Sequence, residues 1–279
     1  MTKSVLITGA NGFVGRHVLK SLENKDVQVT LILRNGFENT RCKQNKVVKI
    51  FKSRDIFMEK SGWWLDVCDR IDTVIHCAWF VKHNEYLDSK ENISCFEGTL
   101  ELAKACKNSN VSRFVGIGTC AEYDSSFGIM STDTPLKPNT IYAKYKNKTN
   151  FALRKIFENS NVAFTWARLF YLYGEGENIN RLYPYIKQQV SKGEMANLSI
   201  GSQVRDFMDV KEAGKILADL ALSSFEGDFN VCSGQGISVK QFAQNVAREY
   251  GSVKLLNFDK KSRNAFDPPS VVGFRSKLD

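Results

Sequence analysis

The sequence lacks paired cysteines. Its seven cysteines are odd in number, and no two of them have the Cys-x-x-Cys spacing. This pattern argues against a disulfide framework and against a zinc site. We therefore expect reduced, mostly buried thiols, no bound metal and a cytoplasmic location.

Long apolar runs are also absent. Met1 to Ser4 lead directly into a short apolar segment, without the hydrophobic region of a signal peptide. No apolar stretch approaches the roughly 18 residues that indicate a membrane-spanning helix. The sequence therefore predicts a soluble chain without a membrane partner.

Acidic residues are outnumbered, and the formal net charge is +9. Such a balance suits anionic partners, among them nucleic acid and phosphorylated small molecules. No block of Lys or Arg is long enough for a nucleic-acid tail. We expect a solvated basic surface rather than a nucleic-acid site.

Short apolar runs alternate with helical stretches through the first half of the chain. The expected strands are Ser4–Thr8, Gln28–Leu33, Val47–Phe51, Thr73–Ala78, Arg113–Ile117 and Ala163–Leu169, and the expected helices are Gly12–Asn24, Asn92–Asn108 and Tyr142–Asn159. This alternation predicts βαβ units and a parallel sheet. The fold class is therefore α/β, a Rossmann-type doubly wound parallel sheet with a smaller C-terminal lobe.

The alternation of strands and helices becomes less regular after about residue 172. We expect helices at Arg181–Lys192, Val210–Leu222 and Val239–Tyr250, with short strands at Leu198–Ile200 and Phe207–Met208. Residues 1–172 are predicted to form the dinucleotide-binding domain. Residues 173–279 are predicted to be mainly a substrate-binding lobe, with some segments returning to the sheet.

A glycine-rich turn follows the first expected strand. Gly9 permits a tight turn, Gly12 lets the backbone approach a pyrophosphate, and Gly15 allows close packing. The following helix would point its N-terminal amides at the phosphates. Because the motif lies between a strand and a helix, it predicts a dinucleotide site rather than an unliganded turn.

The end of the second expected strand bears on cofactor choice. An acidic residue there binds a ribose 2′-hydroxyl, whereas arginine suits a 2′-phosphate. This chain has Arg34, so NADP(H) is favoured and NAD(H) is the alternative. Asp55 and Ile56, after the third strand, are expected to contact the adenine.

Tyr142 and Lys146 are four residues apart at the start of an expected helix and therefore share one face. The ammonium group would lower the pKa of the tyrosine, which could then exchange a proton with a carbonyl or hydroxyl oxygen. Thr119 ends the fifth strand, and its hydroxyl could hold the same oxygen. We predict that these three residues are catalytic.

With these motifs in place, the chain resembles the extended short-chain dehydrogenase/reductase family of nucleotide-sugar epimerases, dehydratases and reductases. The resemblance rests on the glycine turn, the Thr119/Tyr142/Lys146 set, His76-Cys77-Ala78, Asn92, Arg168 to Gly174, Arg205 to Val210, and Asn230 to Gly234. It covers nearly the whole chain.

The resemblance implies residue roles. The cofactor would contact Gly9, Asn11, Gly12, Phe13, Val14, Gly15, Arg34, Asp55, Ile56, Cys77, Ala78, Trp79, Asn92, Tyr142, Lys146 and Phe170. The substrate would contact His83, Thr119, Tyr142, Arg181 and Arg205, with Arg205 on its nucleotide diphosphate. For His83 a surface position is an equal alternative. The helices beginning at Asn92 and Tyr142 would form the four-helix interface of a homodimer.

Departures from the family pattern narrow the reaction. The 4,6-dehydratases carry an Asp-Glu pair after the threonine, but Cys120 and Ala121 stand here. Enzymes similar to GDP-fucose synthase carry a cysteine and a histidine where this chain has Ala121 and Gly176. The expected activity is therefore NADPH-dependent reduction of the 4-keto group of a nucleotide-linked 6-deoxyhexose, of the dTDP-fucose or CDP-abequose type. An NAD-dependent 4-epimerase and a dinucleotide-sensing protein without catalysis are the alternatives.

Overall fold

A parallel sheet forms the centre of the molecule. The computed structural model describes residues 2–36, 47–260 and 267–278. In these ranges the sheet has seven strands: β1 (Lys3–Thr8), β2 (Val27–Arg34), β3 (Val47–Ser53), β4 (Thr73–His76), β5 (Arg113–Thr119), β7 (Ala163–Leu169) and β11 (Gly227–Val231). Their order is β3-β2-β1-β4-β5-β7-β11, and all neighbours pair in parallel. The order reverses between β1 and β4, as in Rossmann folds.

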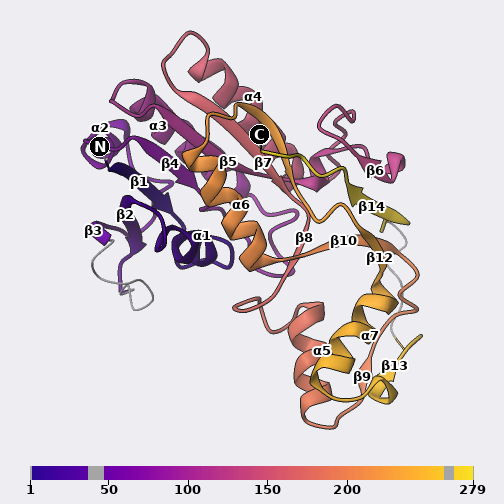
Figure 1. The fold of residues 1–279 in the computed structure, drawn as a ribbon. Helices are drawn as coiled ribbons and strands as arrows, with labels where there is room; N and C mark the ends of the chain where they lie inside the picture. Colours follow the sequence, from indigo (N-terminus) through magenta and orange to yellow (C-terminus); the bar gives the residue numbers. More distant parts are fainter. Residues whose placement is uncertain (1, 37–46, 261–266, 279) are drawn as a thin grey trace.

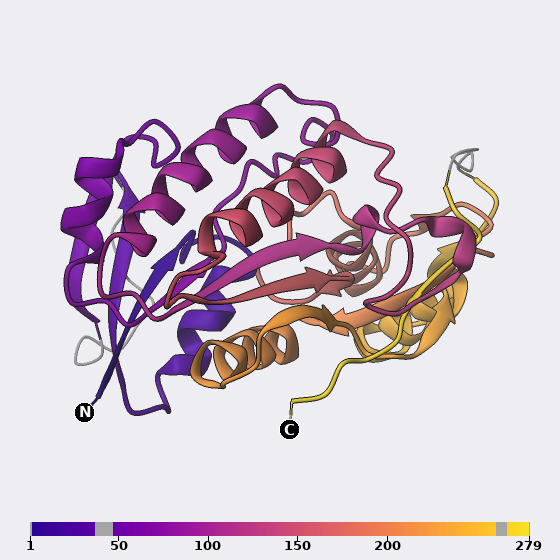
Figure 2. The same cartoon turned by 90° about the horizontal axis from the view of Figure 1, so that it is seen from above.

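Helices cover both faces of this sheet (Figures 1 and 2). One face packs on α1 (Gly15–Leu22) and α6 (Val210–Leu222), and the other on α2 (Ser61–Cys68), α3 (Glu91–Lys107) and α4 (Ile141–Phe157). In β1, Val5 and Ile7 belong to the first core and Leu6 to the second. Strand β1 is therefore buried on both faces, as expected for an inner strand of a parallel sheet.

The C-terminal lobe has its own small core. Helices α5 (Leu182–Ser191) and α7 (Val239–Tyr250) pack together beside the paired strands β9 (Ala196–Asn197) and β13 (Leu256–Asn257). A second sheet links the lobe to the body and contains β12 (Gly236–Ser238), β10 (Val204–Asp209), β14 (Ser270–Gly273) and β6 (Ile129–Met130), with β8 (Tyr171–Tyr173) beside β10. Short 3-10 helices are η1 (Cys120–Glu122), η2 (Ser125–Phe127) and η3 (Val253–Leu255).

The chain crosses between the two units several times. Helix α6 and strand β11 follow residue 172 but pack in the Rossmann body, whereas β6 precedes it and pairs with β14 of the second sheet. The two units are therefore joined by several segments rather than by one linker. The division at residue 172 stays a prediction.

The α/β doubly wound fold class is confirmed, but several predicted elements need correction. The first helix begins at Gly15 instead of Gly12, because Gly12 closes the turn by donating its N–H to the Gly9 carbonyl. The fourth strand ends at His76 instead of Ala78. No strand occupies Leu198–Ile200. The sequence patterns also missed α2 and β11.

Within residues 2–36, 47–260 and 267–278, no helix combines the length and the apolar character needed to cross a bilayer.

Candidate active site

A cavity of about 1280 Å³ opens at the carboxyl ends of the central strands. Residues from the turns after β1, β4 and β5 line it, which is where ligands bind in open α/β sheets. Of the predicted site residues, those that line it are Gly9, Asn11, Gly12, Phe13, Val14, Gly15, Arg34, Asp55, Ile56, Cys77, Ala78, Trp79, His83, Thr119, Tyr142, Lys146, Phe170 and Arg181. Two predicted residues, Asn92 and Arg205, do not line the cavity.

The glycine turn fits the backbone of a dinucleotide. Gly9 has a φ of +68°, and a Cβ there would lie 2.8 Å from the Ala78 amide nitrogen. A Cβ on Gly15 would lie 2.2 Å from the Gly9 carbonyl oxygen. Side chains at either position would disrupt the turn, so both glycines are required by its geometry. Together with Gly12, they leave bare backbone facing the cavity.

The other end of the cofactor groove is basic. Arg34 ends β2, and Arg54 directly follows β3; both are exposed and both line the cavity. Asp55 and Ile56 line the cavity beside them. Two neighbouring guanidinium groups suit an anionic substituent on a ribose.

A buried hydrogen-bond chain fixes the end of β4 against the glycine turn. His76 lies between the Thr8 and Thr99 hydroxyls, with both contacts at 2.9 Å. The Thr8 hydroxyl also accepts from the Ala78 amide. Burial, reinforced by Lys146, lowers the pKa of His76 to about 3, so this imidazole is neutral.

Asn92 supports the site from behind, which corrects its predicted contact with the cofactor. It is fully buried, and its Oδ1 accepts from the Trp79 indole at 2.8 Å. Its amide donates to the carbonyls of Tyr86 and Ser89. Asn92 therefore positions Trp79, which does line the cavity.

Helix α4 presents the tyrosine and the lysine together. Thr140 caps the helix by accepting from the Ala143 amide, so helical geometry begins at Ile141. Lys146 is almost fully buried; its Nζ donates to the Ile117 carbonyl at 2.8 Å and lies 3.7 Å from the centre of the Trp79 ring. Burial lowers the pKa of Lys146 to about 7.

The electrostatics of Tyr142 differ from the sequence-based expectation. Burial raises the pKa of Tyr142 above its usual value, and the hydrogen bond with Thr119 only partly opposes this. Lys146 points to a carbonyl and an indole, and its Nζ is 6.0 Å from the centre of the Tyr142 ring. The predicted lowering of the tyrosine pKa is therefore wrong for this arrangement. Tyr142 is held as a protonated phenol.

Thr119 ends β5 in a capping box. Its hydroxyl accepts from the Ala121 amide, and the Glu122 carboxylate accepts from the Thr119 amide at 2.8 Å. Glu122 is fully buried and also accepts from Trp166 and Arg168. Burial raises the pKa of the Glu122 carboxyl, and the Arg168 charge opposes that shift.

Arg205 requires a second correction. Its guanidinium is buried, pairs with Asp267, donates to the Val204 carbonyl and lies over the Tyr171 ring. Asp267 and Tyr171, rather than Arg205, line the cavity. The predicted direct contact between Arg205 and a diphosphate is therefore not what this arrangement provides. Arg181 does line the cavity, beside Glu177.

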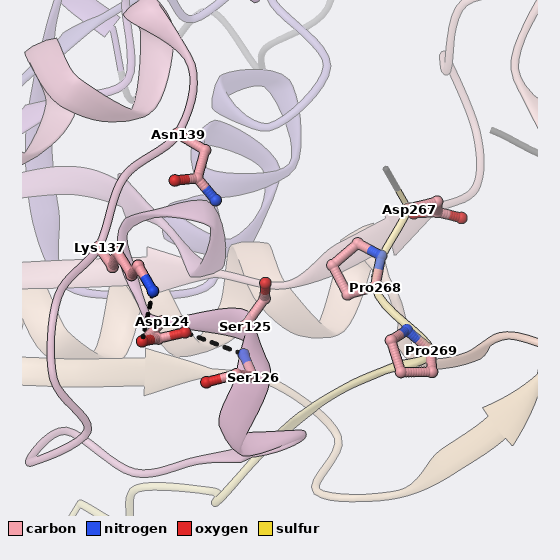
Figure 3. A pocket seen from close by; sticks show the side chains of 8 residues that line it. All are labelled: Asp124, Ser125, Ser126, Lys137, Asn139, Asp267, Pro268 and Pro269. Carbon is pink, nitrogen blue, oxygen red and sulfur yellow. Dashed lines mark hydrogen bonds and ion pairs between the residues drawn. The ribbon is translucent and has the colours of Figure 1, made fainter. Parts of the chain in front are cut away.

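A smaller hollow of about 350 Å³ adjoins this end of the cavity (Figure 3). Asp124 and Lys137 lie on one side, and Asp267 to Pro269 on the other. Ser125, Asn139, Asp267 and Pro268 line both spaces. The hollow is therefore an extension of the main cavity.

Sequence reasoning missed Glu122 as part of the site. A signal was present, because Thr119-Cys120-Ala121-Glu122 has the Thr-x-x-Glu spacing of a capping box. It also missed Asp267, for which local sequence offers no signal, since only the fold brings it to Arg205.

Comparison with known proteins agrees with this geometry. Residues 5–232 match the model of the NAD dependent epimerase/dehydratase family. The chain belongs to this family. A dTDP-6-deoxy-L-talose 4-dehydrogenase (NAD(+)) from Aggregatibacter actinomycetemcomitans is 27% identical, over 97% of this chain and 99% of the relative. A CDP-abequose synthase from Salmonella muenchen is 24% identical, over 92% and 84%.

Solved structures of family members share the fold. The UDP-N-acetylglucosamine 4-epimerase from Methanobrevibacter ruminantium has a TM-score of 0.84 and 21% identity, over 98% of this chain and 90% of that one. The UDP-glucose 4-epimerase from Thermus thermophilus, solved with NAD, has a TM-score of 0.81 and 19% identity, over 97% and 90%. The shared fold agrees with membership of the NAD dependent epimerase/dehydratase family.

Proposed function

We propose that the protein reduces the 4-keto group of a nucleotide-linked 6-deoxyhexose with NADPH. The observation that carries the proposal is that Thr119, Tyr142 and Lys146 line the same cavity as the glycine turn. The names of these two relatives support the reaction at C4, because one is a 4-dehydrogenase of a dTDP-6-deoxyhexose and the other a CDP-abequose synthase; the first name gives NAD(+) as the cofactor.

Protonation of Tyr142 suits the reductive direction. The nicotinamide, when bound, supplies hydride to the carbonyl carbon. Tyr142 donates its phenolic proton to the carbonyl oxygen, and Thr119 holds that oxygen by a hydrogen bond. Lys146, with a pKa of about 7, can supply the proton that restores the phenol.

The neighbouring groups are poorly suited to elimination. Cys120 and Ala121 occupy the cavity positions after Thr119. Burial raises the pKa of Cys120 to about 12, so its thiol is not a base at neutral pH. Glu122, the nearest carboxylate in the chain, is engaged with Thr119, Trp166 and Arg168. Simple carbonyl reduction needs no further acid or base.

Arg34 and Arg54 support NADP(H) as the cofactor, with NAD(H) as the alternative. The glycine turn with Asn11, Phe13 and Val14 would hold the pyrophosphate, and Asp55 and Ile56 the adenine. The nicotinamide would lie among Cys77, Ala78, Trp79, Phe170 and the Tyr142/Lys146 pair. His83 and Arg181 would contact the nucleotide sugar.

Stoichiometry tests this function. Purified protein is mixed with NADPH and a dTDP- or CDP-linked 4-keto-6-deoxyhexose, and both nucleotides are quantified. We expect one NADPH oxidised for each keto sugar reduced. Failure to oxidise either NADPH or NADH with any of these keto sugars would overturn the proposal.

The alternative is an NAD-dependent 4-epimerase, favoured by the epimerases among the structural neighbours. It predicts NAD that stays bound through purification and product formed without net cofactor consumption. Mass spectrometry of the nucleotides released from the purified protein separates the two functions.

We also propose a cytoplasmic homodimer. Helices α3 and α4 pack side by side, and Ile93 and Phe151 are exposed on them. The six cysteines in the described part of the chain are free thiols, as a reducing compartment favours. Sedimentation of a Phe151→Glu variant tests the interface, and we expect a monomer.

A further inference from the structure

Glu122 is a fully buried carboxylate whose nearby polar contacts are donors. Its Oε1 accepts from the Thr119 amide at 2.8 Å, and its Oε2 accepts from Arg168 Nε at 3.0 Å. The Trp166 indole N–H lies 3.2 and 3.1 Å from the two oxygens. An ionised carboxylate offers only acceptors, so this set of donors matches the charged form.

Arg168, the ion-pair partner of Glu122, also contacts groups outside the cavity. Arg168 is buried and also pairs with Asp228, at 3.2 Å from its Nη1. Asp228 is partly exposed and pairs in turn with Arg154 on α4 at 2.6 Å. Arg168 thus has two carboxylate partners, and only Glu122 contacts Thr119. This asymmetry supplies a matched control.

Trp166 connects Glu122 to the catalytic pair: its indole N–H donates to Glu122, and its ring centre lies 5.9 Å from Lys146 Nζ. The charge of Glu122 favours the ammonium form of Lys146 and disfavours the phenolate form of Tyr142. Among the other titratable groups, Cys77 and Cys95 affect the pKa of Lys146. Tyr86 and Cys120 affect the pKa of Tyr142. Arg168 affects the pKa of Glu122, while Tyr123 and Asp228 affect the pKa of Arg168.

We propose that Glu122 is a positioning residue for the reaction, and this inference rests on the proposed function of the same site. Its carboxylate fixes Thr119 at the end of β5. Its negative charge also favours the ammonium form of Lys146 and the phenol form of Tyr142 that carbonyl reduction requires. Arg168 and Trp166 hold this charge in place.

The most direct test measures the protonation of Lys146 and needs no sugar substrate. The intact protein is labelled with acetic anhydride across a pH series, and mass spectrometry quantifies modification of Lys146 in the wild type and in Glu122→Gln. We expect the apparent pKa of Lys146 to fall by about one unit in the variant. With the keto sugar, kcat should fall by about tenfold or more while KM changes by less than about threefold.

Asp228→Asn is the matched control, because it also removes a carboxylate from Arg168. We expect it to lower Tm without moving the pKa of Lys146. If Glu122→Gln fails to fold, Glu122→Gln/Arg168→Gln removes both members of the buried ion pair and leaves no unpaired charge. This double variant should still show the lowered Lys146 pKa.

An unchanged Lys146 pKa in Glu122→Gln or in the double variant would overturn the inference. A Lys146 pKa that falls equally in Asp228→Asn would also overturn it, since the effect would then be structural. Wild-type protein that reduces no keto sugar but shows the expected shift would refute the proposed reaction and leave the role of Glu122 intact.

Discussion

The two ends of the cavity differ in the groups that hold a buried cation. At the catalytic end, Lys146 is held by the Ile117 carbonyl and the Trp79 ring, and burial lowers its pKa to about 7. At the lobe end, Arg205 is paired with a carboxylate, that of Asp267. Lys146 can therefore lose and regain a proton near neutral pH, whereas Arg205 is held in an ion pair. The first arrangement suits chemistry, and the second suits the fixing of structure.

Among the variants that test this difference, the one that removes the proton donor Tyr142 should have the largest effect. Tyr142→Phe should reduce kcat by about a thousandfold, because the carbonyl oxygen then receives no proton from the enzyme. Tyr145→Phe is the control, since Tyr145 lies on the same helix but packs against Phe96. Steady-state kinetics check the prediction, and equal losses in the two variants would contradict it.

The lowered pKa of Lys146 also predicts a pH dependence of stability. In the unfolded chain the lysine has its usual value of 10.5, so between about pH 7 and 10.5 the unfolded state binds the extra proton. The contribution of Lys146 to stability therefore rises with pH in this window, by at most about 1.4 kcal/mol per pH unit. Denaturant unfolding should show it as a difference between wild type and Lys146→Met that grows with pH, because the buried thiols and phenols titrate in both proteins. Parallel curves would indicate that Lys146 is not neutralised by folding.

Arg205 should affect substrate binding more than chemistry. Arg205→Met removes the partner of Asp267 and the cation over Tyr171, two residues that line the cavity. We expect KM for the nucleotide sugar to rise about tenfold and kcat to change by less than about threefold. A thousandfold loss of kcat would mean that the two ends of the cavity do not differ as described.

The smallest effect concerns cofactor choice. Arg34→Ala should lower the ratio of NADPH to NADH affinity by about tenfold, because one charge-assisted contact to a 2′-phosphate is lost. Fluorescence titration with both cofactors measures this ratio. An unchanged ratio would favour NAD(H) or assign the selectivity to Arg54.

The catalytic end and the lobe also differ in how well the sequence predicted their structure. The glycine turn and the Tyr142/Lys146 pair are local patterns that spacing reveals, the family resemblance predicted that they share one site, and both line the same cavity. In the lobe, strand β9 has two residues and is defined by pairing with β13, about 60 residues later. No period exists in so short a segment, which is why Leu198–Ile200 was wrongly predicted as the strand.

Two further omissions have similar causes. Helix α2 has adjacent apolar residues, Trp63 and Trp64, and only eight residues in all, so no helical period is visible. Asp267 meets Arg205 through tertiary structure, and this pairing changes the role expected for the arginine. The family resemblance predicted a diphosphate ligand for Arg205; the neighbouring carboxylate was not visible in the local sequence.

The position of the transferred hydride tests the central claim most directly. The protein is incubated with NADPH deuterated at the transferred position and a nucleotide-linked 4-keto-6-deoxyhexose, and the product is examined by NMR and mass spectrometry. We predict one deuterium at C4 of the sugar and one oxidised cofactor per product, with both absent in Tyr142→Phe. A product free of deuterium and formed without cofactor consumption would contradict reduction as the reaction of this site.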